Sequence, residues 1–278
     1  MSDPHDDTGL HLHLKQMGVD PARREVLVWL GAVALLPLTG CAGDKGDDGG
    51  DGCCAGDSDG AGDSVEDTGA QACEALPQET PGPYPGDGSN GANALALDDI
   101  VRDDMRTSIG DKSGTAQGEP LIVRLRVVDA ASGCVPLVGY AVYLWHATKD
   151  GLYSMYTDPD QNYLRGVQVS DSDGWVTFTT IFPGCYDGRW PHMHFEIFKS
   201  LDDISSASNA VSTSQLALPR DACEEVYTIS GYETSADNLT RVSLGTDGVF
   251  RDGATSQVAT VTGTAAEGRE ATLVLGVG

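Results

Sequence analysis

Residues 189–198, with the sequence RWPHMHFEIF, decide how this chain is interpreted. The stretch is rich in aromatic and apolar residues after Pro191, so we expect a β-strand there. Side chains alternate between the two faces of a strand, so His192 and His194 project from the same face, about 7 Å apart along the chain. Two imidazoles on one face can bind one metal ion, although a His-x-His pair also occurs as two solvent-facing side chains.

Two tyrosines strengthen the metal-site interpretation. Tyr186 lies in the turn-rich stretch 182–188 (FPGCYDG), directly before the expected strand, and Tyr153 lies further upstream. A tyrosinate is a hard, anionic oxygen donor, so two tyrosines and two histidines can together hold one hard metal ion. The competing interpretation is that each tyrosine buries its ring and hydrogen-bonds its hydroxyl group.

The rest of the chain after residue 120 has the pattern of a β-protein. We expect strands at residues 120–129, 138–147, 166–170, 175–181, 257–262 and 270–275. The dipeptide Asp173-Gly174 is a turn signal and predicts a hairpin between the third and fourth of these strands. Residues 97–105 are expected to form a short helix or a turn. Short strands with Gly/Asp turns and few long helices predict an all-β fold, a β-sandwich.

The first 41 residues have the pattern of an export signal. Arg23 and Arg24 precede an apolar run over residues 26–38, which is too short to span a membrane. The run ends in Leu-Thr-Gly-Cys at residues 38–41, which resembles a bacterial lipobox, and the paired arginines resemble a twin-arginine signal. We therefore expect an exported protein, lipid-anchored through Cys41 at the outer face of the cell membrane. The alternatives are a core helix or an ordinary signal peptide, with Cys41 incidental.

Residues 42–72 consist mainly of Gly, Asp, Ser and Ala, so they cannot bury enough apolar surface to offset their ordering entropy. We expect this segment to be a disordered acidic tether, and a single folded domain at residues 73–278. The roles of Cys53 and Cys54 within the tether stay open. A formal net charge of -25 disfavours nucleic-acid binding, because phosphate contacts need a basic surface.

A series of spaced motifs runs through the middle of the chain. They are CVPL (134–137), VYLWH (142–146), GLYS (151–154), LRG (164–166), DG (173–174), PGCY (183–186) and RWPHMH (189–194). Together they resemble the intradiol ring-cleavage dioxygenases, the family of protocatechuate 3,4-dioxygenase and catechol 1,2-dioxygenase. The earlier TPGPY (80–84) is also similar to a motif of that family, with Pro81 in place of the usual Glu.

The resemblance implies a β-sandwich of the intradiol type with a non-haem Fe³⁺ held by Tyr153, Tyr186, His192 and His194. In the family pattern Tyr186 and His192 are axial ligands, and the other two are equatorial. It also implies a catechol-type substrate that is cleaved with O2 between its two hydroxylated carbons to a muconate-type diacid. Tyr186 then acts as a base, and Arg189 stabilises charge on the ring.

Other residues near these motifs receive lesser roles. Candidate walls of the substrate pocket are Pro83, Tyr84, Leu152 and Trp190, with core packing as the alternative for each. His146 is expected to be a hydrogen-bonded structural histidine, and Tyr156 and Tyr163 are expected to pack or to line the cleft.

Four cysteines fall in the expected domain, and an exported location permits disulfides. Four cysteines allow three pairings, and the pairing we favour is Cys185 with Cys223 and Cys73 with Cys134. A metal-thiolate site is a poorer explanation because no Cys-x-x-Cys spacing occurs.

Two other functions compete with the dioxygenase. One is a non-catalytic, exported β-sandwich binding module with a structural or vestigial metal site. The other is a metal-dependent hydrolase that uses His192 and His194, which leaves both tyrosines unexplained. The resemblance also makes a homodimer an expectation, because dimers are common in the family.

Overall fold

The computed structural model describes residues 74–278, so the predicted signal, tether and lipidated Cys41 lie outside the described residues. Within that part the strands are β1 Pro120–Asp129, β2 Val135–Pro136, β3 Ala141–Trp145, β4 Arg165–Val169, β5 Trp175–Ile181, β6 His192–Phe198, β7 Ser212–Ala217, β8 Thr260–Thr262 and β9 Arg269–Val277. Two short α-helices, α2 Arg220–Val226 and α3 Glu233–Leu239, and four 3-10 turns complete it, the turns at Leu201–Ser205, Ala207–Asn209, Phe250–Asp252 and Thr255–Gln257.

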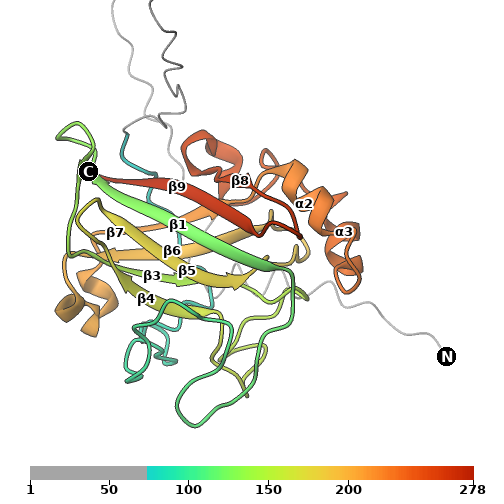
Figure 1. Ribbon diagram of the computed structural model, residues 1–278, viewed down its shortest axis with the longest axis horizontal. Coiled ribbons are helices and arrows are strands. Elements are labelled where there is room, and N and C mark those ends of the chain that lie inside the picture. Colours follow the sequence, from blue (N-terminus) through green and yellow to red (C-terminus); the bar gives the residue numbers. More distant parts are fainter. Residues whose placement is uncertain (1–73) are drawn as a thin grey trace, which may run out of the picture. The chain divides into compact units, whose positions relative to one another are not determined.

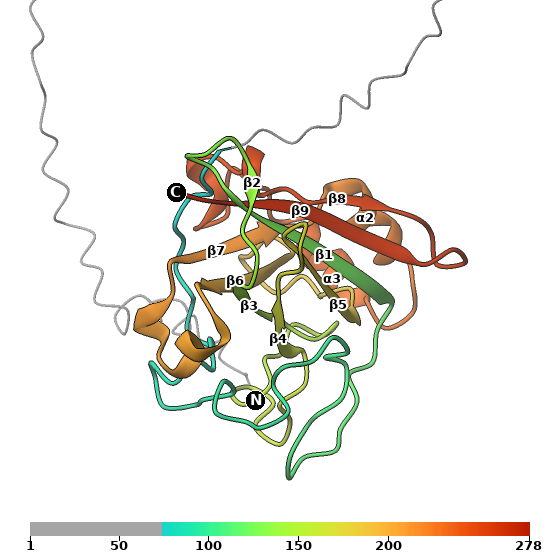
Figure 2. The same cartoon turned by 60° about the vertical axis from the view of Figure 1, so that its left-hand side comes forward.

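The strands form two sheets that pack face to face (Figure 1). A four-stranded antiparallel sheet has the order β4-β3-β6-β7. The five-stranded sheet has the order β2-β1-β9-β8, and β5 also pairs with β1. The C-terminal strand β9 runs parallel to β1 and lies beside it in both views (Figure 2). This arrangement confirms the predicted all-β sandwich.

The four-stranded sheet is buried on both of its faces, and this positions the site. On β6, Met193, Phe195 and Ile197 point into the main core between the sheets. The alternate residues of the same strand point to the opposite face, where a second apolar cluster includes Trp145 and Phe198. His192 and His194 therefore lie on the second face, as the strand pattern predicted, and they are buried there rather than exposed to solvent.

One predicted strand pairing is wrong. β4 and β5 do not form a hairpin, because β4 pairs with β3 and β5 pairs with β1 in the other sheet. The turn at Asp171–Gly174 is formed, with the Gly174 amide donating to the Asp171 carbonyl. This turn carries the chain from one sheet to the other. The prediction of a turn is therefore confirmed, and the prediction that β4 and β5 pair is wrong.

Other elements match the sequence to different degrees. The strand at residues 120–129 is confirmed over its whole length, whereas the one predicted at 138–147 is limited to Ala141–Trp145. Residues 97–105 contain turns and isolated bridges, including Val101 to Val167, and no helix. In the late region, a 3-10 turn takes up Thr255–Gln257, so that strand begins at Thr260. The strand β7 and both helices were not predicted.

The helix α2 lies next to the beginning of β9, where Arg269 Nη2 is 2.7 Å from Glu225 Oε1. Its buried residues Ala222, Cys223 and Val226 pack into the main core. Across residues 74–278, none of the helices has the length and apolar character that crossing a membrane requires.

The favoured disulfide between Cys185 and Cys223 is wrong, because both residues are buried free thiols. Burial raises the pKa of the Cys185 thiol to about 12, so it stays protonated and does not compete as a metal ligand. Cys134 is disulfide-bonded, and its partner lies outside the described residues, so the pairing with Cys73 stays a prediction.

Candidate metal centre

Three segments bring the four predicted ligands together. His192 and His194 come from β6, Tyr186 from the loop that connects β5 to β6, and Tyr153 from the loop that connects β3 to β4. Tyr153 and both histidines are at most 3% exposed, and Tyr186 is partly buried. Residues far apart in sequence thus place their polar tips in one region that is largely closed to solvent.

In five of the six pairs among the four side chains, the donor atoms are 3.1–3.4 Å apart. The hydroxyl of Tyr153 lies 3.1 Å from Nε2 of His194, and 3.4 Å from both Nε2 of His192 and the hydroxyl of Tyr186. Nε2 of His192 lies 3.2 Å from the Tyr186 hydroxyl and 3.1 Å from Nε2 of His194. Adjacent ligands about 2 Å from a transition-metal ion are about 3 Å apart, so the set fits a single ion.

Tyr186 and His192, which the family resemblance implies as the axial ligands, have their donor atoms 3.2 Å apart. Among these four side chains, the pair for which the structure shows no contact is Tyr186 and His194. The axial and equatorial positions stay predictions of the resemblance.

Burial sets the charge of these groups. It lowers the pKa of His192 and of His194 well below the ordinary value, so both imidazoles are neutral and can donate a lone pair to a metal. Burial also raises the pKa of Tyr153 well above its ordinary value, with the nearby Tyr186 adding to the effect. A cation at the centre would reverse the tyrosine shift, because it stabilises the phenolate form.

The rings of the histidines are held by their surroundings. Nδ1 of His192 is hydrogen-bonded to the carbonyl of Trp190, which leaves Nε2 facing the centre. The ring of His194 is stacked on the indole of Trp145 and is covered by Gly82, whose φ of +73° is in the left-handed region. Nδ1 of His194 is buried and has no hydrogen-bond partner among the residues that the structure describes.

Arg189 lies beside the ligands, as predicted, and two residues that sequence reasoning missed hold it. Its Nη1 is 3.5 Å from the hydroxyl of Tyr186. Its Nη2 donates to Oε1 of Gln215 on β7 at 2.6 Å, and its Nε donates to Oδ2 of Asp247 at 2.9 Å. Gln215 lies in a polar strand and Asp247 in a Gly/Thr/Asp loop, so neither has a local sequence signal that marks it.

Two of the four predicted pocket walls lie close to the ligands. The ring centroid of Tyr84 is 5.2 Å from that of Tyr153, and Leu152, next to Tyr153, is 43% exposed. Pro83 is partly buried, and its carbonyl accepts a hydrogen bond from Asn90.

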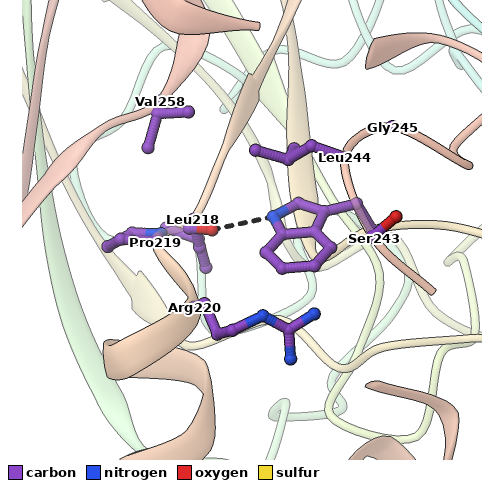
Figure 3. A pocket seen from close by; sticks show the side chains of 8 residues that line it. Leu218, Pro219, Arg220, Ser243, Leu244, Gly245 and Val258 are labelled. Atoms are coloured by element: carbon purple, nitrogen blue, oxygen red, sulfur yellow. Dashed lines mark hydrogen bonds between the residues drawn. The ribbon is translucent and has the colours of Figure 1, made fainter. Parts of the chain in front are cut away.

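The fourth predicted wall, Trp190, lines a different hollow of about 390 Å³ with Leu218, Arg220, Leu244 and Val258. Its indole nitrogen donates to the carbonyl of Leu218, and the Arg220 guanidinium lies 4.8 Å from the ring (Figure 3). None of the four ligand side chains lines that hollow.

His146 is a structural histidine, as predicted. Its ring nitrogens are hydrogen-bonded to Thr180 Oγ1 and to the carbonyl of Ala147, and burial lowers its pKa to about 4. Tyr163 donates to a carboxylate oxygen of Asp158. Tyr156 packs its ring 5.1 Å from that of Tyr84, so it borders the site without touching the donor atoms.

Comparisons with known proteins find similar sequences and structures among dioxygenases. A family model described as Dioxygenase matches residues 99–193. An intradiol ring-cleavage dioxygenase from Tetranychus urticae has a similar structure, with a TM-score of 0.57 and 26% sequence identity, over 74% of this chain and 94% of that chain. A chlorocatechol 1,2-dioxygenase from Rhodococcus opacus is 41% identical over 54 residues, which span 19% of this chain and 21% of that protein.

The described part of the chain therefore resembles the intradiol ring-cleavage dioxygenases in fold and in local sequence. This likeness agrees with the resemblance that the spaced motifs indicated. The matched family segment ends at Met193, between the two histidines, so it includes three of the four predicted ligands and not His194.

Proposed function

We propose that this chain is a non-haem ferric dioxygenase that cleaves a catechol-type ring between its hydroxylated carbons with O2 to give a muconate-type diacid. The observation that carries the proposal is the convergence of two phenol oxygens and two imidazole nitrogens, at separations of 3.1–3.4 Å. Hard phenolate donors with neutral imidazoles suit Fe³⁺, and the phenolates offset part of its charge.

The chain's own residues have defined tasks in this reaction. Bound Fe³⁺ would supply the Lewis acidity and the redox chemistry that make an aromatic diol reactive toward O2. The Tyr186 oxygen accepts a proton from a substrate hydroxyl. Arg189, whose Nη1 lies 3.5 Å from that oxygen, stabilises negative charge that develops on the substrate. Tyr84 and Leu152 are proposed to contact the ring.

The location of the protein is a separate proposal that depends on sequence alone. The signal-like residues 1–41 support export and lipid attachment at Cys41, so the enzyme would work at the outer face of the membrane. Expression of the full chain with Cys41→Ala tests this, because the variant should move from the membrane fraction to the soluble exported fraction. An unchanged membrane fraction contradicts the lipid anchor.

The expected homodimer is a further proposal. Light scattering of the purified protein measures its molar mass in solution and tests this proposal.

The activity is tested on iron-loaded protein with a panel of catechols. We expect O2 uptake and a ring-opened diacid in a 1:1 ratio, together with a tyrosinate-to-iron charge-transfer colour. Tyr153→Phe and His194→Ala should abolish both the colour and the product. Tyr140→Phe, a partly buried tyrosine outside the site, is the matched control and should keep both.

The competing functions predict different results. A binding module with a vestigial site would bind iron or aromatic ligands without consuming O2. A hydrolase would act without O2 and would tolerate loss of the Tyr153 hydroxyl. Full ring cleavage by the Tyr153→Phe, His194→Ala double variant would overturn the ligand assignment.

A further inference from the structure

Asp247 is a completely buried carboxylate that receives four N–H groups. Its Oδ2 accepts from Nε of Arg189 at 2.9 Å and from the backbone N–H of Trp190 at 2.7 Å. Its Oδ1 accepts from the backbone N–H groups of Val249 at 2.7 Å and Phe250 at 3.2 Å. Oδ2 thus binds the segment that precedes β6, and Oδ1 binds backbone N–H groups of the loop that contains Asp247 itself.

The guanidinium of Arg189 is a flat group with two anchored corners. Asp247 holds Nε and Gln215 holds Nη2, so the plane of the group is fixed and the remaining Nη1 is directed at the Tyr186 hydroxyl. The side chain of Arg189 is 19% exposed, whereas that of Asp247 is 0% exposed. The anchor is therefore deeper in the protein than the group it holds.

We propose that Asp247 is the positioning residue for Arg189, and this inference rests on the proposed dioxygenase function. The hydrogen bonds that the structure shows for Asp247 go to Arg189 and to three backbone N–H groups, and not to the four proposed ligand side chains, so it acts through Arg189. An arginine without this partner would be free to turn its long side chain toward solvent. Because the pair of opposite charges is nearly neutral, Arg189 contributes a directed N–H group at Tyr186 rather than an unbalanced positive charge.

The alternative is that Asp247 serves as a cap for its own loop and nothing more. The loop also lines the hollow around Trp190 through Ser243 and Leu244 (Figure 3), which fits a purely structural role. The two roles use different carboxylate oxygens, and this allows them to be separated. A serine at position 247 can still accept a hydrogen bond from an N–H two residues ahead while losing its reach to Arg189.

The test compares Asp247→Asn and Asp247→Ser with Asp252→Asn, which removes an exposed carboxylate a few residues away. In metal-free protein, labelling of arginines by phenylglyoxal is followed by mass spectrometry. We expect Arg189 to react at least tenfold faster in both Asp247 variants, and at the wild-type rate in the control. Arg165, which is 1% exposed, is the internal reference and should stay protected. An unchanged rate at Arg189 overturns the proposal.

Kinetics of the iron-loaded protein provide the second arm. Both variants should lower kcat by roughly 10- to 100-fold with KM nearly unchanged, because a displaced catalytic group mainly affects the transition state. In an Arg189→Lys background the same substitutions should lower kcat little further, because the side chain that Asp247 positions is already altered. Independent, additive losses would contradict a role through Arg189, as would a wild-type kcat in both variants.

These two arms separate the inference from the proposed function. If wild-type protein shows no ring cleavage, the function fails, while the labelling still decides whether Asp247 positions Arg189. If neither variant folds, labelling of the wild-type protein is the test. An Arg189 side chain that is held in place should react with phenylglyoxal about as slowly as Arg165. A rate like that of Arg124, whose side chain is 40% exposed, overturns the proposal.

Discussion

The imidazole of His194 lies almost parallel to the indole of Trp145, with ring centroids 5.0 Å apart and an interplanar angle of 8°. The two residues are directly opposite each other on β6 and β3. Trp145 is fully buried, so its ring forms a rigid support for a proposed metal ligand. Two further neighbours, Tyr143 and Gly82, complete the packing around this pair.

Trp145→Leu should therefore weaken both the fold and iron binding. Loss of the large buried ring is expected to cost about 2–4 kcal/mol in the free energy of unfolding. Loss of the support for His194 should lower iron affinity by about tenfold. Urea unfolding and competition with a chelator measure the two effects. Trp145→Phe should recover part of both, and Trp175→Leu, on a half-buried tryptophan of β5, should leave iron affinity unchanged.

Gly82→Ala tests the cover over the same histidine. An added Cβ would lie 3.2 Å from Cε1 of His194, and the φ of +73° is unfavourable for alanine. We expect a loss of about 1–2 kcal/mol in stability together with weaker iron binding. Gly91→Ala is the matched control, because Gly91 has a φ of +109° but no atom within 4 Å of an added Cβ. Equal iron affinity in the two variants would show that Gly82 does not support His194.

His146 should make the metal-free protein less stable in acid. Burial lowers its folded-state pKa to about 4, below the unfolded value of about 6.5. Between these values the unfolded chain binds a proton that the folded chain does not, so stability falls as the pH is lowered from about 6.5 to about 4. The loss due to His146 is up to about 3 kcal/mol. Urea unfolding across this window should show a smaller slope for His146→Gln than for wild type.

Glu196 should produce the opposite dependence. Burial and the charge of Asp87 raise the pKa of Glu196 to about 8, so the folded protein holds a proton that the unfolded chain loses near pH 4.5. Its contribution is complete below about pH 4.5 and is lost as the pH rises through about 8. Glu196→Gln keeps a neutral side chain at every pH and should be more stable than wild type at pH 9, by on the order of a few kcal/mol. Identical pH profiles would argue that Glu196 is ionised in the folded protein.

Both free cysteines should be unreactive in the folded protein. Burial raises the pKa of the Cys185 thiol to about 12 and that of Cys223 well above its ordinary value, so neither forms a reactive thiolate near neutral pH. Iodoacetamide labelling followed by peptide mass spectrometry should modify both residues after unfolding, and neither before. Both cysteines should also be labelled after unfolding without a reductant, because neither is in a disulfide. A disulfide-linked peptide containing both cysteines would contradict the structure.

The ligand strand was predictable because its signal is local. Because side chains alternate along β6, His192 and His194 lie on the same face. Tyr186 lies only a few residues before this strand. Tyr153, 33 residues before Tyr186, depended on the family resemblance instead. Strand 120–129 was predicted because its alternating pattern reflects one face in the core.

The parts that failed depend on contacts between distant segments. The turn at Gly174 was recognised, but which strands pair is decided by the packing of two sheets and not by the turn. The strand β7, with the sequence STSQLA, is buried except for the partly buried Thr213, although four of its six residues are polar, so hydropathy did not mark it. Asp247 resembles many other acidic residues in this chain until its four N–H partners are known.

The two faces of β6 link the proposed metal site to the packing of the sandwich. Sliding this strand by a single residue against β3 would bring Met193 and Phe195 to the ligand face and turn both imidazoles into the main core. A shifted alignment of this strand would therefore disturb the core and the proposed metal site together. A related chain that keeps this alignment also keeps positions 192 and 194 directed at one point.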